Sequence, residues 1–235
     1  DWSSDVCSSD LLSFLLIASY AETISGDCGE DVKYSFDDNN GKLTISGFGP
    51  MTDYSYYSPA PWKQYSNRIR SAVIDEGVTT IGAFAFYECS SLTKITIHES
   101  VKSIGNSAFS GCSKLSSVNI PKGISSIESG LFSSCSNLKS IIIPESVKSI
   151  GEFAFSDTGL TSINIPGNVT SIGYNAFSGC SKLSSVNIPE GISSIESRLF
   201  SSCSNLKSII IPESVTSIGE FAFSDTGLTS INIPG

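Results

Sequence analysis

Charged residues and histidine are scarce in this chain of 235 residues. Only 16% of the residues are charged, the single histidine is His98, and acidic residues outnumber basic ones by 23 to 14. A nucleic-acid partner would require a basic stripe, and the sequence has none, so we expect no nucleic-acid binding. One histidine also argues against a histidine-rich metal site and against histidine-based acid–base chemistry. No C-x2-C pair is present either, which disfavours zinc.

Serine and isoleucine are abundant instead, with 49 and 28 copies. The hydrophobic fraction is 40%, and a disordered chain would not hold so many isoleucines. We therefore expect an ordered protein of one or two domains. The serine-rich strings contain nucleophile types, but no base lies at a recognisable spacing from them. The expectation is a non-enzymatic protein with no cofactor, no metal and no small-molecule substrate.

The two ends of the chain differ from the rest. Residues 1–10 lack an initiator methionine and resemble translated adapter sequence. Residues 11–21 form an apolar run that ends in small residues, and we interpret them as the remnant of a secretory signal peptide. Eleven residues are too few to span a bilayer, for which roughly 20 are needed. A buried strand or helix is the alternative to the signal peptide. The chain stops within a repeat, so we expect a fragment whose membrane contact, if any, comes through an anchor outside it.

A repeat of 22 or 23 residues fills the chain from residue 69 to residue 235. Each unit follows the pattern L-x-x-I-x-I-P-x-x-V-x-x-I-G-x-x-A-F-x-x-C-x-x. Residues 110–167 match residues 178–235 at 55 of 58 positions, which indicates duplication of a block of 68 residues. The units begin at Ile69, Leu92, Leu115, Leu138, Leu160, Leu183, Leu206 and Leu228, giving seven full units and a partial eighth.

The unit pattern predicts local structure. The alternation in I-x-I predicts a short strand, usually closed by proline, and His98 takes that corner in one unit. We expect V-x-x-I-G to turn the chain at a glycine with positive φ, and A-F-x-x-C to form a helical or 3-10 turn. Stacked units would share one core. The recurring cysteines would then form a column of buried thiols rather than disulfides, although their spacing permits either. They are Cys89, Cys112, Cys135, Cys180 and Cys203.

The unit resembles the BspA-like subtype of the leucine-rich repeat. The stretch from Ile141 to Phe155 follows that family's string almost letter for letter, and the resemblance covers residues 69–235. It implies a β-rich repeat solenoid of short parallel strands, turns and 3-10 or helical turns. BspA-like proteins are associated with attachment to host matrix proteins and to other cells. The resemblance therefore implies a secreted or cell-surface protein.

Residues 22–68 are expected to form an N-terminal β capping module. Apolar residues alternate on both sides of Asn39-Asn40-Gly41, which predicts a β-hairpin. Repeat arrays need such a cap because the first coil would otherwise expose its apolar edge. The alternative is an aromatic ligand platform, for example for sugars, made by Tyr54, Tyr56, Tyr57, Trp62 and Tyr65.

The variable positions of L-x-x-I-x-I would line one polar, nearly uncharged face of the solenoid. We predict that this chain is adhesin-like and binds extracellular protein or glycan ligands through this face, with two exposed isoleucines as anchors. A structural spacer, or a targeting arm for a further domain, is the alternative, and the duplication favours it. The candidate ligand face comprises Thr93, Lys94, Thr96, Ser116, Ser117, Asn119, Lys139, Ser140, Ile142, Thr161, Ser162, Asn164, Ser184, Ser185, Asn187, Lys207, Ser208 and Ile210.

Overall fold

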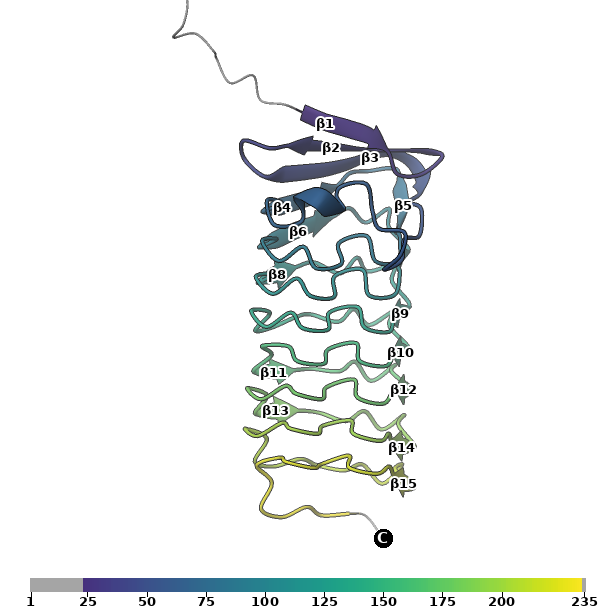
Figure 1. Cartoon of the computed structure of the whole chain (residues 1–235). Helices are drawn as coiled ribbons and strands as arrows, with labels where there is room; N and C mark the ends of the chain where they lie inside the picture. Colours follow the sequence, from purple (N-terminus) through teal and green to yellow (C-terminus); the bar gives the residue numbers. More distant parts are fainter. Residues whose placement is uncertain (1–22, 234–235) are drawn as a thin grey trace, which may run out of the picture.

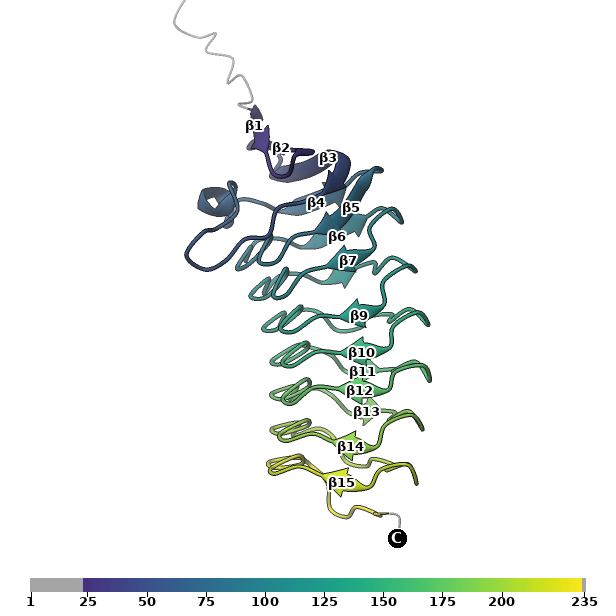
Figure 2. The same ribbon diagram turned by 90° about the vertical axis from the view of Figure 1, so that its right-hand side faces the viewer.

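The computed structural model describes residues 23–233, which form a rod of stacked coils with a small sheet at one end (Figures 1 and 2). The predicted repeat solenoid is thereby confirmed. The predictions for residues 1–10 and 11–21 lie outside the described residues. In both views the coils stack nearly straight. Among the described residues, no helix combines the length and the apolar character needed to span a bilayer.

The first side of the rod carries the strands predicted from I-x-I. They pair in parallel with their counterparts in neighbouring coils, for example Ile74 with Ile97. The strands are β4 (Ser71–Ile74), β6 (Lys94–Ile97), β8 (Ser117–Val118), β11 (Ser162–Ile163) and β13 (Ser185–Val186). No strand forms at residues 140–143, and residues 208–211 contribute only an isolated bridge between Ile210 and Asn232. The alternating pattern is thus present in every unit, but regular pairing is not.

The second side carries parallel strands where the sequence predicted a turn. The strands are β5 (Val78–Ile81), β7 (Ser103–Ile104), β9 (Ser126–Ile127), β10 (Ser149–Ile150), β12 (Ser171–Ile172), β14 (Ser194–Ile195) and β15 (Ser217–Ile218). The x-I residues before the glycine of V-x-x-I-G therefore form a short strand, and the prediction of a turn there was wrong.

The glycine of this segment does not take a positive φ, which also corrects the prediction. It lets adjacent coils approach instead, since a Cβ on Gly105 would lie 2.4 Å from the backbone nitrogen of Ala83. Glu128 and Glu196 replace this glycine in two coils. The ladder of parallel strands on this side is interrupted just before each of these two coils: β9 does not pair with β7, and β14 does not pair with β12. The replaced glycine thus explains where the second ladder breaks.

The third side consists of tight turns rather than helices. Turn bonds such as Cys112 N–H to Phe109 O, 3.1 Å, have the i to i−3 spacing of a 3-10 turn. Two residues with positive φ interrupt them in each coil, for example Ser107 at 53° and Gly111 at 75°. Backbone N–H groups here donate to the following coil, as Phe132 does to Ala154 at 2.8 Å. Between residues 23 and 233, the one 3-10 helix is η1 (Lys63–Tyr65).

One phenylalanine from each coil forms a continuous stack through the core. Neighbouring rings are stacked with their centroids 5.4–5.8 Å apart. The rings belong to Phe86, Phe109, Phe132, Phe155, Phe177, Phe200 and Phe223, and the first six are fully buried. Since no single coil can surround its own ring, each coil depends on its neighbours for its core.

The N-terminal sheet provides the first rung of both ladders. Strands β2 (Asp31–Asp37) and β3 (Lys42–Pro50) form the predicted antiparallel hairpin, and β1 (Thr23–Asp27) adds a third strand. β3 then pairs in parallel with β4 through residues 42–45 and with β5 near its end. Gly47, at a φ of 120°, lies where a Cβ would be 2.0 Å from the carbonyl oxygen of Asp31. One long strand thus covers the open edge of the first coil.

Candidate functional site

All eighteen residues of the predicted ligand face are exposed. Those in strands lie on β6, β8, β11 and β13, where the inward positions of each I-x-I segment are in the core. The two isoleucines are strongly exposed for apolar side chains, at 86% for Ile142 and 85% for Ile210. The eighteen residues therefore lie at the surface, and their role in ligand binding stays a prediction.

About a third of these side chains are held by the backbone of the preceding coil. Thr93, Ser116, Thr161 and Ser184 donate their hydroxyls to a carbonyl one coil earlier, over 2.9–3.3 Å. Asn119 and Asn187 each form two bonds, one to the N–H and one to the carbonyl of a residue in the preceding coil. These six residues therefore act in the coil-to-coil contact, which the sequence pattern did not reveal.

A hollow opens on this face where strand pairing stops. It lies between residues 116–122 and residues 140–146, next to β8, and has a volume of about 660 Å³. Ser117, Ser140 and Ile142 line it, and within residues 23–233 the structure gives the two serines no side-chain hydrogen bond. The hollow thus combines hydroxyl groups with an exposed apolar side chain, as binding sites commonly do.

The duplicated block repeats this hollow. The second copy lies between residues 184–190 and residues 208–212 and has a volume of about 440 Å³. Ser185 and Ile210 stand where the first copy has Ser117 and Ile142. The rims differ at two positions: Lys122 in the first copy corresponds to Glu190 in the second, and Glu99, which lines the first hollow, corresponds to Gly167. The same surface feature therefore occurs twice on one face, with opposite charge at one rim.

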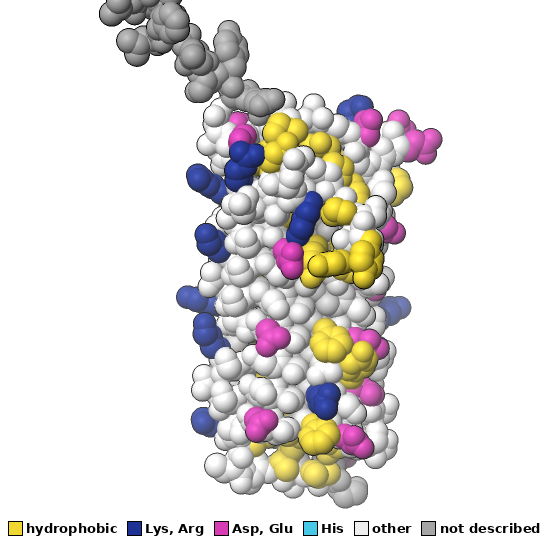
Figure 3. All heavy atoms as spheres, in the orientation of Figure 1, with side chains coloured by type: hydrophobic (Ala, Val, Ile, Leu, Met, Phe, Trp, Pro, Cys, Tyr) yellow, Lys and Arg dark blue, Asp and Glu magenta, His cyan; other side chains and the backbone are white. Residues whose placement is uncertain are grey.

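Basic side chains gather along the edge of the rod that carries β4, β6, β8, β11 and β13 (Figures 1 and 3). The candidate face itself contains Lys94, Lys139 and Lys207, all exposed. In a chain with a formal net charge of −9, this is a local positive row. Such a row favours encounter with a partner that is acidic on its contacting surface.

The cysteine column consists of buried free thiols, which confirms that prediction. In coil after coil the thiol donates to the carbonyl of the preceding coil's phenylalanine, as Cys112 does to Phe86 at 3.1 Å. Burial raises the pKa of the Cys89 thiol to about 12 and that of Cys180 to about 11. Thr158 replaces cysteine in one coil and contacts the Cys180 sulfur at 3.1 Å. Within residues 23–233, no three His, Cys, Asp or Glu side chains form a metal-binding cluster.

His98 is a corner residue, as predicted. Its Nδ1 atom lies 3.0 Å from the Ser100 hydroxyl and accepts the Ser100 backbone N–H at 3.1 Å. Both contacts are local, within the turn that follows β6. These contacts provide hydrogen-bond partners within the turn, and neither of them joins the imidazole to a second titratable group.

The structure divides the aromatic set of the capping module. Trp62 is fully buried, and Tyr54 and Tyr65 are partly buried and pack against the core. Tyr56 and Tyr57 are exposed, at 68% and 93%. They are joined by Phe84 and Tyr87 of the first coil, which the sequence analysis did not single out. The available signal was that six later coils have serine at the position of Tyr87.

Stacked parallel coils with a shared Leu/Ile/Phe core define a leucine-rich-repeat solenoid, a fold that is generally non-enzymatic. The family model described as "BspA type Leucine rich repeat region" matches six copies in this chain, over residues 64–184 and 139–235. The chain belongs to the BspA-type leucine-rich-repeat family.

Solved structures of bacterial leucine-rich-repeat proteins resemble this chain. A leucine-rich repeat protein from Bacteroides ovatus is 31% identical, with a TM-score of 0.66 over 88% of this chain and 59% of that one. The Treponema protein TpLRR (T. pallidum) is 30% identical, with a TM-score of 0.62 over 79% and 82%. A leucine-rich cell surface protein from Faecalibacterium prausnitzii is 27% identical, with a TM-score of 0.53 over 91% and 77%. No curated protein matches significantly.

Proposed function

We propose that this chain is the binding region of a secreted or surface-displayed, non-enzymatic, adhesin-like protein that recognises extracellular partners through the candidate face. The family membership and the cell-surface relative from Faecalibacterium prausnitzii support this proposal. So does the chemistry of the face, which offers hydroxyls, lysines and exposed isoleucines rather than an acid, a base and a nucleophile in mutual contact.

The repeated hollow is the observation that carries the proposal. Ile142 and Ile210 are large apolar side chains left in solvent, each beside hydroxyl groups and a charged rim residue. A partner that engages both hollows gains avidity, because the second contact forms at high effective concentration. Simultaneous engagement suits a large extracellular ligand, either a matrix protein or an extended glycan.

The test is binding of the chain to arrays of purified extracellular-matrix proteins and glycans. The double variant Ile142→Glu/Ile210→Glu should lose binding, as should charge substitutions at Ser117, Ser140 and Ser185. Phe221→Glu is the matched control, because it places the same charge at a 60% exposed apolar residue outside the candidate face. Unchanged binding by the face variants, or equal loss with the control, contradicts the proposal.

A structural spacer is the second candidate, since the duplication extends the rod by copying a nearly unchanged block. Deleting residues 110–177 removes one copy and keeps the remaining repeats in phase. A binding face with two hollows predicts a loss of apparent affinity of about tenfold or more after this deletion. A spacer predicts a shorter particle with no change in affinity.

A further inference from the structure

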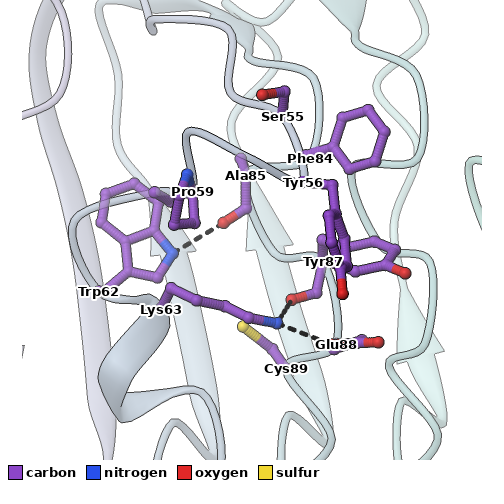
Figure 4. Close-up of a pocket in the computed structure, with 11 residues that line it drawn as sticks. Ser55, Tyr56, Pro59, Trp62, Lys63, Phe84, Ala85, Tyr87, Glu88 and Cys89 are labelled. Carbon is purple, nitrogen blue, oxygen red and sulfur yellow. Dashed lines mark hydrogen bonds and ion pairs between the residues drawn. The ribbon is translucent and has the colours of Figure 1, made fainter.

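A partly open hollow lies where the capping module meets the first coil (Figure 4), away from the candidate face. Its volume is about 310 Å³. Three elements form it: the loop from Ser55 to Ala60, the segment around η1, and the first-coil turn from Phe84 to Cys89. The volume lies at the lower end of the range of small-molecule sites and suits a ligand of one or two rings.

Four of its eleven lining residues are aromatic: Tyr56, Trp62, Phe84 and Tyr87. The ring centroids of Tyr56 and Tyr87 are 6.4 Å apart, those of Phe84 and Tyr87 are 5.3 Å apart, and Tyr57 lies beside Tyr56 at 5.3 Å. Trp62 also lines the hollow and is fixed by its indole N–H, which donates to Ala85 O at 2.8 Å (Figure 4). Rings contributed by separate segments thus converge on one space, on a rigid support.

The repeat itself does not require Tyr87. Serine stands at the same place in the six later coils, where the turn folds equally well, at Ser110, Ser133, Ser156, Ser178, Ser201 and Ser224. The tyrosine is therefore specific to the coil that faces the capping module. It is half-buried, so part of its ring remains available to a ligand.

Glu88 is the second departure from the repeat. Its φ is 56°, a left-handed conformation that is unfavourable for a long side chain, and the next coil has Gly111 there. Its carboxylate accepts a hydrogen bond from Lys63 Nζ at 2.9 Å, and the same ammonium donates to Tyr87 O at 2.9 Å (Figure 4).

The charges of the hollow balance each other. Lys63 and Glu88 are paired, and they are the charged residues among those that line the hollow within residues 23–233. Lys63 Nζ also lies 5.0 Å from the centroid of the Tyr87 ring. A charged ligand would have to separate this pair, whereas a neutral ligand with hydroxyl groups can bond to both members.

We propose that this hollow is a carbohydrate-binding site that takes a neutral pyranose ring. A pyranose has an apolar C–H face and a rim of hydroxyls. The C–H face matches the rings of Tyr56, Phe84 and Tyr87, and neighbouring hydroxyls match the Glu88 carboxylate and the Lys63 ammonium. The balanced pair disfavours uronic acids and amino sugars. This site is independent of the candidate face and of the function proposed for that face.

The test is isothermal titration of the purified chain with cellobiose, lactose and maltose, and with glucuronic acid and glucosamine as charged comparators. Binding of at least one neutral disaccharide, in preference to both charged sugars, is expected. Tyr87→Ser should weaken that binding about tenfold, through loss of the aromatic contact, while the turn keeps the residue used by the other coils. Phe221→Ser, at an exposed aromatic on the last full coil, is the control and should leave affinity unchanged.

Glu88→Gly separates ligand binding from folding. Glycine is favourable at a φ of 56°, so the urea midpoint of this variant should not fall, yet its sugar affinity should. Absence of binding to all three disaccharides overturns the proposal. Preferential binding of a charged sugar, full affinity in Tyr87→Ser or Glu88→Gly, or saturable binding of a polyproline peptide without any sugar binding also overturns it.

Discussion

Two phenylalanines of one coil allow a direct test of the stacked core. Phe155 is fully buried between Phe132 and Phe177, with ring centroids 5.7 Å and 5.4 Å away. Phe153, two residues earlier, is 40% exposed and touches only Tyr174 among the rings of the described residues, at 5.0 Å. Phe155→Ala should cost about 3–5 kcal/mol of unfolding free energy, through lost burial and the cavity left behind. Phe153→Ala should cost only about 0.5–1.5 kcal/mol.

Urea unfolding followed by circular dichroism measures both variants against the parent chain. Both substitutions replace a phenylalanine with alanine in the same coil, and they differ in the burial of the ring and in backbone conformation, since Phe153 has a φ of 55°. Because each coil is stabilised by its neighbours, loss of the Phe155 ring should also broaden the transition as the two halves of the rod uncouple. Equal destabilisation by the two variants, or a loss below about 1.5 kcal/mol for Phe155→Ala, would refute the stacked-core reasoning.

Three further predictions concern polar groups. Within residues 23–233 the buried Tyr54 hydroxyl has no hydrogen-bond partner, so Tyr54→Phe should leave stability unchanged or raise it by about 1 kcal/mol in urea unfolding. Asn187→Ala should cost about 1–3 kcal/mol, because it leaves a backbone N–H and carbonyl unpaired, whereas Asn164→Ala, at the same place in the preceding coil, should cost under about 0.5 kcal/mol. Burial raises the pKa values of the cysteine thiols, that of Cys135 to about 12. The buried thiols therefore stabilise the fold fully below the pKa of an unfolded thiol, and this stabilisation is lost as pH rises toward 12. Unfolding free energy measured under reducing conditions should therefore fall above about pH 9, less steeply in Cys135→Thr.

The core of the rod was predictable from the sequence because it repeats. Leu, Ile and Phe recur at fixed places, and most of these places are buried; the exceptions include Ile218, which is 38% exposed, and the partly buried Phe223 and Leu228 near the end of the rod. The inward-facing thiols followed for the same reason. The hairpin was predictable from the alternation on both sides of the Asn39-Asn40-Gly41 turn, and β2 and β3 pair there.

The errors arose where a residue acts through a neighbouring coil. Gly105 looked like a turn glycine, yet its role is to let the Ala83 backbone approach, which only the stacked structure shows. Asn119 looked like a ligand-facing residue, yet its amide pairs with the backbone of Ile97. Tyr87 escaped notice because its partners belong to the capping module. Contacts between residues that are 22 or more positions apart in the sequence therefore cannot be predicted when each repeat unit is interpreted by itself.

The duplicated block separates the demands of folding from those of the surface. Its two copies differ at three pairs of positions, Lys122/Glu190, Gly130/Arg198 and Lys148/Thr216. Five of these six residues are exposed, and the sixth, Gly130, has the positive φ that Arg198 shares. Not one pair changes a core side chain, so the two copies keep the same coil geometry. The two hollows thus differ in rim charge, at Lys122/Glu190 and through Glu99, which lines only the first hollow. Lys122→Glu or Glu190→Lys reverses the charge at one of these positions while leaving the stack intact. A partner whose affinity differs between these two variants recognises the rim charge. A partner that binds both variants equally recognises the isoleucine and serines that the two hollows share.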